Sequence, residues 1–92
     1  MRDDYFTMCE VARVARVDPQ RMKAILGRYD DSPTKRVGGR YVIPKAQFFK
    51  WYDTHKNDDG LMYCFDDSSI EGARTEFVLH RNKVRLYRGL AR

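Results

Sequence analysis

Residues 7–27 read TMCEVARVARVDPQRMKAILG and contain two helix-start signals in close succession. The first is a capping box formed by Thr7 and Glu10, in which each side chain accepts a hydrogen bond from the backbone N–H of the other residue. Apolar residues follow the box at helical spacing. The sequence therefore predicts a short helix from about residue 8 to residue 15.

The second signal is the pair Asp18 and Pro19, a typical N-cap followed by a typical first helical residue. The helix that begins there is predicted to end at Gly27. Its positions predicted to face the core are Met22, Ile25 and Leu26. Residues 16–17 are all that separates the two helices. So tight a connection is typical of a helix-turn-helix, in which the second helix is free to enter a groove of DNA.

The pair Gly38-Gly39 lies between two β-prone runs, residues 34–37 and 40–43. Both glycines can adopt positive φ without steric cost, so the pair predicts a two-residue hairpin turn. Pro44 then blocks the strand and opens a third helix, from about residue 45 to residue 54. The aromatic residues of that helix expected in the core, rather than as a base-stacking platform, are Phe48, Trp51 and Tyr52. This order of elements predicts a small winged helix-turn-helix over residues 1–54.

The second half of the chain has weaker signals. Residues 61–65 are predicted to form a short strand, and residues 75–79 and 84–87 are predicted to pair as a hairpin. The competing interpretation is a helix that starts at Ser68, but a glycine and a threonine inside it disfavour that helix. We therefore expect an α+β fold whose C-terminal extension, residues 55–92, is mostly strand and packs on the same domain or on a neighbouring copy.

The formal net charge of the 92 residues is +5, and it is unevenly distributed. Residues 1–52 have 11 Lys and Arg against 6 Asp and Glu, residues 53–74 have 2 against 6, and residues 75–92 have 5 against 1. A basic domain of this size is a candidate for nucleic-acid binding, because Lys and Arg that neutralise phosphates release condensed counterions. The acidic middle segment is expected to be a solvated loop, to keep DNA off one face, or to pair with a basic face of another copy.

Several classes of protein are disfavoured by what the sequence lacks. No apolar run approaches the ~20 residues that cross a bilayer and no secretory signal follows the N-terminus, so we expect no membrane partner and a cytoplasmic location. Cys9 and Cys64 are expected to be reduced and half-buried, and the spacing of cysteines and histidines does not fit a metal site. Asp53 and His55 could be read as an acid–base pair, but no nucleophile motif accompanies them. We expect no enzyme activity, no metal and no cofactor.

Three stretches of the first half carry a resemblance to a known family. They are residues 5–12 (YFTMCEVA), 17–22 (VDPQRM) and 36–44 (RVGGRYVIP), followed by Trp51. In this order they resemble the excisionase-type, MerR-like winged helix-turn-helix, found in excisionases, also called recombination directionality factors. The resemblance implies double-stranded DNA binding, with the second helix in the major groove and the hairpin, or wing, against the backbone or minor groove. The family usually has glycine or another turn-tolerant residue where this chain has Arg16.

Seven side chains are expected to contact DNA. On and just past the second helix they are Gln20, Arg21, Lys23 and Arg28. On the hairpin they are Lys35, Arg36 and Arg40. Residues in the first turn of a recognition helix reach base edges, whereas the later cations are expected to contact phosphates. The alternatives are ordinary solvated side chains on the helix, charges that keep an edge hairpin soluble, and an Arg36 turned inward over Tyr41.

These features favour a sequence-specific double-stranded DNA-binding protein. The resemblance implies an excisionase that acts with an integrase by bending attachment-site DNA, and the small footprint of one domain implies further copies on adjacent sites. A phage or mobile-element transcriptional regulator with the same fold is an alternative, although no sustained heptad pattern after residue 54 indicates the long dimerisation helix of MerR-type activators. A third alternative is a protein-interaction module or host-protein inhibitor that binds no DNA. The basic residues near the C-terminus are compatible with a wider DNA footprint, with docking on another copy, or with a solvated tail.

Overall fold

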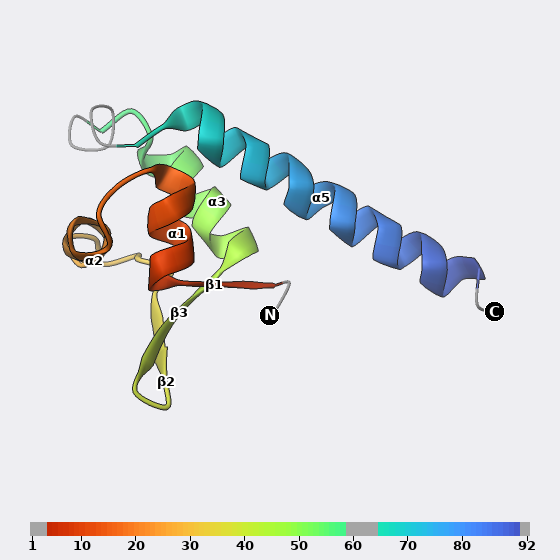
Figure 1. Cartoon of the computed structure of the whole chain (residues 1–92), viewed down its shortest axis with the longest axis horizontal. Helices are drawn as coiled ribbons and strands as arrows, with labels where there is room; N and C mark the ends of the chain where they lie inside the picture. The colour runs from red at the N-terminus through yellow and green to blue at the C-terminus, as the bar shows by residue number, and fades with distance from the viewer. Residues whose placement is uncertain (1–3, 59–64, 91–92) are drawn as a thin grey trace.

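Four helices and a three-stranded antiparallel sheet make up the part of the chain that the computed structural model describes, residues 4–58 and 65–90 (Figure 1). Side chains are described as far as residue 83. In chain order the elements are β1 (Tyr5–Thr7), α1 (Met8–Ala15), α2 (Pro19–Leu26), β2 (Lys35–Val37), β3 (Arg40–Pro44), α3 (Lys45–His55) and α5 (Asp67–Leu90). The expected α+β class is confirmed, and so is the order of two short helices, a hairpin and a third helix.

The caps that predicted α1 and α2 are both formed. The backbone N–H of Glu10 donates to Thr7 Oγ1 at 3.1 Å, and the backbone N–H of Thr7 donates to Glu10 Oε1 at 2.9 Å. At α2 the backbone N–H of Gln20 donates to Asp18 Oδ2 at 3.0 Å. These bonds satisfy N–H groups that a helix leaves unpaired in its first turn, and they fix where both helices begin.

The turn between α1 and α2 places Arg16 in the left-handed region, with φ 58° and ψ 45°. The backbone N–H of Val17 then donates to the carbonyl of Ala12 at 2.9 Å, which closes the end of α1. Asp66 contacts this turn from the second half of the chain. Its backbone N–H donates to the carbonyl of Ala15 at 3.0 Å, so the segment before α5 is fastened to the corner between the first two helices.

β3 is the central strand of the sheet, with β1 on one edge and β2 on the other. Its outer half pairs with β2 across the predicted hairpin, and its inner half pairs with β1, where Phe6 lies opposite Ile43. Gly38 and Gly39 have φ values of 56° and 81°, as a two-residue turn of this kind requires. The sequence analysis missed β1, because three residues are too few to show an alternating pattern.

The hydrophobic core takes residues from every helix of the described chain and from β1 and β3. The buried face of α2 consists of Met22, Ile25 and Leu26, as predicted. The aromatic residues of α3 that are buried are Phe48, Phe49, Trp51 and Tyr52. Their burial confirms the core assignment and leaves no ring face of α3 for stacking on single-stranded bases. Cys9 is exposed rather than half-buried, and Cys64 lies outside the described residues.

The second half of the chain forms a helix where strands were predicted. α5 is continuous from Asp67 to Leu90, so the predicted strands at residues 75–79 and 84–87 are wrong. The predicted strand at residues 61–65 lies outside the described residues except for Phe65, which is at a bend. Short apolar runs fit the period of a strand and of a buried helix equally well, so the sequence pattern did not separate the two.

Tertiary burial and a good N-cap explain why α5 forms despite its weak propensity. The backbone N–H of Ser69 donates to Asp66 Oδ1 at 3.1 Å, and Ile70 is fully buried in the core. The two residues that disfavoured the helix both lie on its exposed side. Gly72 has no atom within 4 Å of the place where a Cβ would lie, and the Thr75 hydroxyl donates to the carbonyl four residues before it at 3.0 Å.

The first half of α5 packs on the rest of the fold, with Ile70 in the core and Phe77 against it. Figure 1 shows the helix continuing away from the other elements toward its C-terminal end. Leu79, in the middle of α5, is 62% exposed. A helix of 24 residues is about 36 Å long. Despite this length, neither α5 nor any other helix of the described chain is apolar enough to cross a membrane.

Candidate nucleic-acid interface

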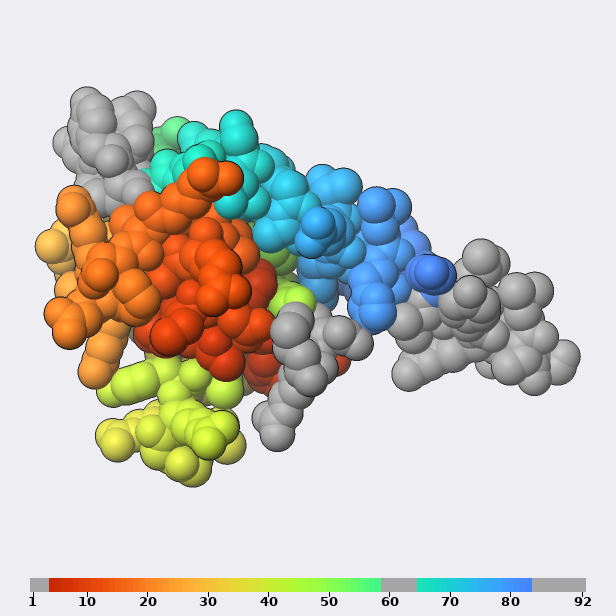
Figure 2. All heavy atoms as spheres, viewed as in Figure 1, coloured from red at the N-terminus to blue at the C-terminus, as the bar shows by residue number. Residues whose placement is uncertain are grey.

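All seven residues predicted to contact DNA are exposed, and they lie on α2, on the hairpin or just after α2. The residues concerned are Gln20, Arg21, Lys23, Arg28, Lys35, Arg36 and Arg40. Figure 2 shows α2 (orange) and the β2–β3 hairpin (yellow) on the side of the molecule away from the blue part of α5. The long helix therefore does not cover the surface on which these seven side chains lie.

The exposed face of α2 follows from its buried face. Because Met22 and its neighbours one turn away face the core, Gln20 and Ala24 lie at the centre of the exposed side at 100° per residue. Arg21 and Lys23 lie on its two flanks. The helix thus presents a small residue and an amide between two cations. The sequence analysis did not select Ala24, although its position four residues after Gln20 places it on the same face.

Tyr41 connects α2 to the hairpin. Lys23 Nζ lies 4.9 Å from the centre of the Tyr41 ring, and the guanidinium carbon of Arg36 lies 5.9 Å from the same ring. These are distances at which a cation is attracted to the electron-rich face of an aromatic ring. Arg36 therefore lies over Tyr41, the position considered from the sequence as an alternative, and its side chain remains exposed. Lys23, expected to contact a phosphate, is also exposed and lies over the same ring.

The strand register divides the hairpin cations between two faces. Arg36 lies opposite Tyr41 in the ladder, so both side chains point to the face that meets α2. Lys35 and Arg40 occupy alternate positions and point to the other face. Val37 shares that second face and is 57% exposed, which the sequence analysis did not predict. A narrow ribbon with cations on both faces is suited to contact phosphates on either side of it.

Many acidic side chains already have partners elsewhere in the fold. The described pairs include Glu10 and Asp18 with helix N-termini, Asp31 and Asp58 with His55, Asp53 and Glu71 with Arg74, and Asp66 with Arg16. Among the described residues, Arg28, Lys35 and Arg40 form no ion pair. In the described part of the chain these three cations therefore have no acidic partner within ion-pair distance, which leaves them available to contact phosphates.

Four titratable side chains meet where the connection between α2 and β2 contacts the end of α3. We call them the His55 cluster (Tyr29, Asp31, His55 and Asp58). His55 Nε2 is 2.8 Å from Asp31 Oδ2, and His55 Nδ1 is 3.0 Å from Asp58 Oδ2. The Tyr29 hydroxyl donates to the same Asp58 oxygen at 3.1 Å. The pairing of His55 with Asp53 considered from the sequence is not formed, because Asp53 accepts a hydrogen bond from Arg74 at 2.7 Å.

The pKa values of two members of the cluster are shifted. The hydrogen bond with Asp31 raises the pKa of His55 above its ordinary value of 6.5, against the smaller opposing effect of burial. Asp58 acts in the same direction as Asp31. Burial raises the pKa of Tyr29, and the hydrogen bond to Asp58 raises it further. The cluster therefore favours a charged imidazole beside a neutral phenol.

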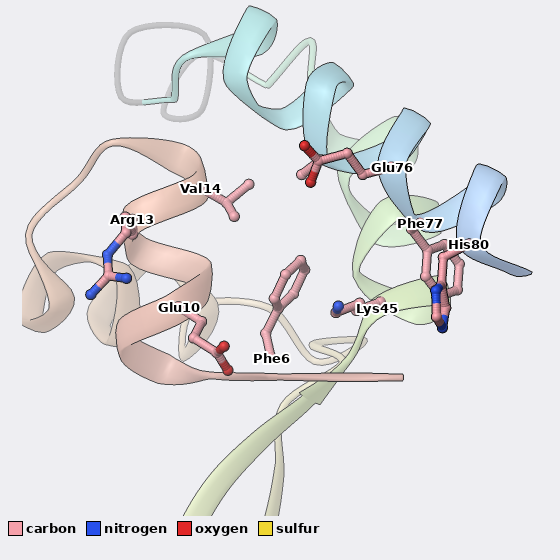
Figure 3. A pocket seen from close by; sticks show the side chains of 9 residues that line it. Phe6, Glu10, Arg13, Val14, Lys45, Glu76, Phe77 and His80 are labelled. Carbon is pink, nitrogen blue, oxygen red and sulfur yellow. The ribbon is translucent and has the colours of Figure 1, made fainter. Parts of the chain in front are cut away.

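A groove lies between α1 and α5 (Figure 3), and Phe6 of β1, Val14 of α1 and Phe77 of α5 line it. Lys45 Nζ lies 5.1 Å from the centre of the Phe6 ring at one end of the groove. Within the described residues no group of three His, Cys, Asp or Glu side chains is arranged to hold a metal ion. Since α2 packs on another side of α1, this groove is separate from the surface of α2 and the hairpin (Figure 1).

The C-terminal cations are described in part. Arg81 lies over the ring of Phe77, with its guanidinium carbon 5.5 Å from the ring centre, and Lys83 is exposed.

Comparisons with models of protein families, with curated proteins and with solved structures find no match to this chain.

Proposed function

We propose that this chain is a non-enzymatic, sequence-specific double-stranded DNA-binding protein of the winged helix-turn-helix type. The observation that carries the proposal is the surface formed by the exposed side of α2 and the hairpin. The two elements meet at Tyr41, and three cations of this surface, Arg28, Lys35 and Arg40, form no ion pair with any described residue. In this arrangement α2 enters the major groove and the hairpin contacts the backbone or the minor groove beside it.

The exposed face of α2 suits the reading of base edges. Gln20 and Arg21 lie in the first turn of the helix, the part that approaches the bases in recognition helices. Glutamine pairs with adenine and arginine with guanine through two hydrogen bonds each, worth about 1–3 kcal/mol of discrimination per pair. Ala24 lets the helix approach closely and offers a methyl group to thymine. The cations Arg28, Lys35 and Arg40 then add affinity through phosphates.

The biological role that we propose is excisionase-like, and it rests on the resemblance of residues 5–54 to that family. One such domain covers about 600–1,000 Å², so useful specificity requires several copies on adjacent sites or an integrase bound beside them. Bending an attachment site by 40–90° costs about 1–6 kcal/mol, which phosphate contacts from several copies can offset.

Binding to a mixed-sequence duplex over a series of salt concentrations tests the proposal. Logarithmic affinity is expected to fall linearly with logarithmic salt concentration, by about 0.9 for each phosphate contacted. Ala24→Glu, which adds a carboxylate at the centre of the exposed face of α2, is expected to abolish binding. Ala46→Glu on α3 is the matched control, because Figure 1 shows the start of α3 and α2 on different sides of α1. No duplex binding at low salt would overturn the proposal and favour a protein-interaction module.

A dimeric transcriptional regulator is the second candidate, and α5 favours it. The sequence has no heptad pattern after residue 54, and this weighed against a long C-terminal helix. The structure nevertheless has a long helix there, the 24 residues of α5. Residues 67–76 of α5 carry three acidic residues and one basic residue, whereas residues 77–90 carry four basic residues and none that is acidic. Antiparallel packing of two α5 helices would place opposite charges together. Footprints on two inverted half-sites would support the regulator, and footprints on direct repeats would support the excisionase.

A further inference from the structure

The His55 cluster joins three segments that are separate in the sequence. His55 is the last residue of α3, Asp58 follows that helix, and Asp31 lies in the connection between α2 and β2. Tyr29 belongs to the same connection, and its ring centre lies 4.3 Å from that of His55 and 5.2 Å from that of Trp51. The connection between α2 and the hairpin is therefore held against the end of α3 by the contact of His55 with Asp31, by the hydrogen bond from Tyr29 to Asp58 and by the packing of Tyr29 on Trp51.

The geometry of the cluster requires a fully protonated ring. Each nitrogen of His55 lies within 3.0 Å of a carboxylate oxygen, and an ionised carboxylate accepts hydrogen bonds without donating any. A neutral imidazole has one N–H and can donate to one of the two carboxylates. Loss of the proton therefore breaks one of the two hydrogen bonds of His55. The bond to Asp31, which joins the ring to the connection, is the one lost when the remaining proton is on Nδ1. The side chain of His55 is 19% exposed, so water replaces the lost bond only in part.

The segment that contains Asp31 connects the two halves of the candidate DNA interface. Residues 27–34 connect α2, whose exposed face bears Gln20 and Arg21, to β2 of the hairpin. Arg28, one of the cations without an acidic partner among the described residues, lies in this segment next to Tyr29. The angle and distance between α2 and the hairpin therefore depend on how this segment is held.

We propose that His55 is a positioning residue for the DNA-binding surface, and that its protonated form holds the connection between α2 and the hairpin in the geometry that binds DNA. This inference rests on the proposed function and adds proton control to the same surface. His55 itself contacts Asp31, Asp58 and Tyr29, so it acts on DNA through the segment that it holds.

The charged groups around the cluster support this assignment. On α3, Asp53 accepts from Arg74, and Lys56 lies 3.9 Å from Asp53, so this pair is directed to α5. On the connection, Arg28 acts on the Tyr29 hydroxyl and lowers its pKa, in opposition to Asp31 and Asp58. Asp31 and Asp58 face His55 itself and both raise its pKa. The two carboxylates that face the ring therefore both stabilise the protonated form of His55.

The direction of the pH effect follows from the raised pKa of His55. The stabilising contribution of the protonated ring is complete below 6.5, the ordinary histidine value, and is lost as the pH rises through the higher value of the folded protein. Affinity for DNA is expected to decrease over that same range. The decrease is about tenfold for each unit by which bound DNA raises the pKa of His55 further.

An NMR titration of the ring protons tests the cluster without DNA. The chain has two histidines, so His80→Gln leaves His55 as its remaining imidazole. The midpoint of the titration is expected above 6.5. Asp31→Asn, which keeps an acceptor and removes the charge, is expected to lower this midpoint. Asp30→Asn is the matched control, because it removes the adjacent exposed carboxylate and is expected to leave the midpoint unchanged.

Binding to a short mixed-sequence duplex at constant salt tests the connection to DNA. The affinity of the wild-type chain and of Asp30→Asn is expected to fall through the midpoint measured by NMR. In Asp31→Asn the fall is expected at lower pH. In His55→Gln, whose amide does not titrate, the affinity is expected to stay constant over this range.

Three outcomes would overturn the inference in distinguishable ways. A His55 midpoint at or below 6.5 would show that the protonated cluster is not favoured. A raised midpoint, together with the same pH profile of affinity in wild type and His55→Gln, would show that the cluster does not control the DNA surface. No duplex binding by the wild type at any pH would overturn the proposed function and the link to DNA together, while the NMR titration would still decide the protonation of the cluster.

Discussion

The guanidinium Nε of Arg16 lies 3.3 Å from the Asp66 carboxylate, which also caps the first turn of α5. Among the described residues, Arg16 is the one non-glycine residue with a positive φ. The backbone N–H of Asp66 also donates to the carbonyl of Ala15, at the end of α1. The corner between α1 and α2 and the beginning of α5 therefore form one packed unit, so the second half of the chain contributes to the angle at which α2 is presented.

Two substitutions at Arg16 separate backbone strain from the ion pair. Left-handed geometry costs a residue with a Cβ about 1–2 kcal/mol, whereas an exposed ion pair contributes about 0–1 kcal/mol. We expect Arg16→Gly to be at least as stable as wild type, and Arg16→Ala to be less stable than Arg16→Gly by about 1 kcal/mol. Thermal unfolding of the three proteins measures the difference. Equal stability of the two variants would contradict the strained turn.

Base-reading and phosphate-binding residues are expected to respond differently to truncation. Arg21→Ala is expected to lose about 1–3 kcal/mol of discrimination between a selected site and a scrambled duplex. Lys35→Ala is expected to weaken binding to all duplexes alike and to reduce the salt dependence by about one phosphate. Competition binding with both duplexes measures the two effects. Uniform loss in both variants would show that α2 does not read bases.

Tyr41 is expected to act through its ring rather than its hydroxyl. Tyr41→Leu removes the aromatic ring over which Lys23 and Arg36 lie. The cation–π contact between α2 and the hairpin is then lost. We expect affinity for a duplex to fall about two- to fivefold, as the loss of about 0.5–1 kcal/mol in cation–π attraction implies. Tyr41→Phe keeps the ring and is expected to retain wild-type affinity. Equal loss in both variants would assign the effect to the hydroxyl.

The stability of the fold is expected to depend on pH through His55. Because the folded protein raises the pKa of this imidazole, the contribution of the proton is complete below 6.5 and disappears as the pH rises through the folded value. Urea denaturation across this range is expected to show decreasing stability in wild type and a flat profile in His55→Gln. A wild-type profile that rises over the range would contradict the raised pKa.

Docking of α5 on the core is expected to depend on Ile70 and not on Leu79. Ile70 is fully buried, so Ile70→Ala is expected to cost about 2–5 kcal/mol of unfolding free energy. Leu79 is 62% exposed, and Leu79→Ala is expected to change the stability of a single chain by less than about 0.5 kcal/mol. Denaturant unfolding at low protein concentration compares them. A neutral Ile70→Ala would show that α5 does not share the core.

The elements that could be predicted from the sequence are those whose signals lie within a few residues. The capping box of Thr7 and Glu10, the N-cap Asp18 and the turn at Gly38 and Gly39 all act on their immediate neighbours. β1 has no such local signal, and the start signal of α5 is opposed by the glycine and the threonine inside that helix. β1 is a strand because β3 lies beside it, and α5 begins with a side chain buried among residues from the first half of the chain. Long-range packing therefore decided the two elements that the sequence analysis missed.

The candidate interface divides in the same way. The exposed side of α2 could be predicted, because the buried Met22 fixes where the other side points. The contacts that orient this surface could not, because Lys23 with Tyr41 and His55 with Asp31 join different elements. A lysine on an exposed helix and a histidine at a helix end each have many possible partners in the sequence, and the tertiary fold selects one.

The β2–β3 ribbon is anchored at one end and projects from the fold at the other. Its base at Ile43 is fully buried and paired with β1. Its free end is the turn at Gly38-Gly39, where a side chain in place of either glycine would have no neighbouring atom within 4 Å of its Cβ. Inserting two residues into each strand near the tip would lengthen the ribbon by about 7 Å and return every side chain to its original face. A series of proteins with ribbons of different length would measure how far the binding partner lies from the core. The hydrophobic core would be the same in all of them.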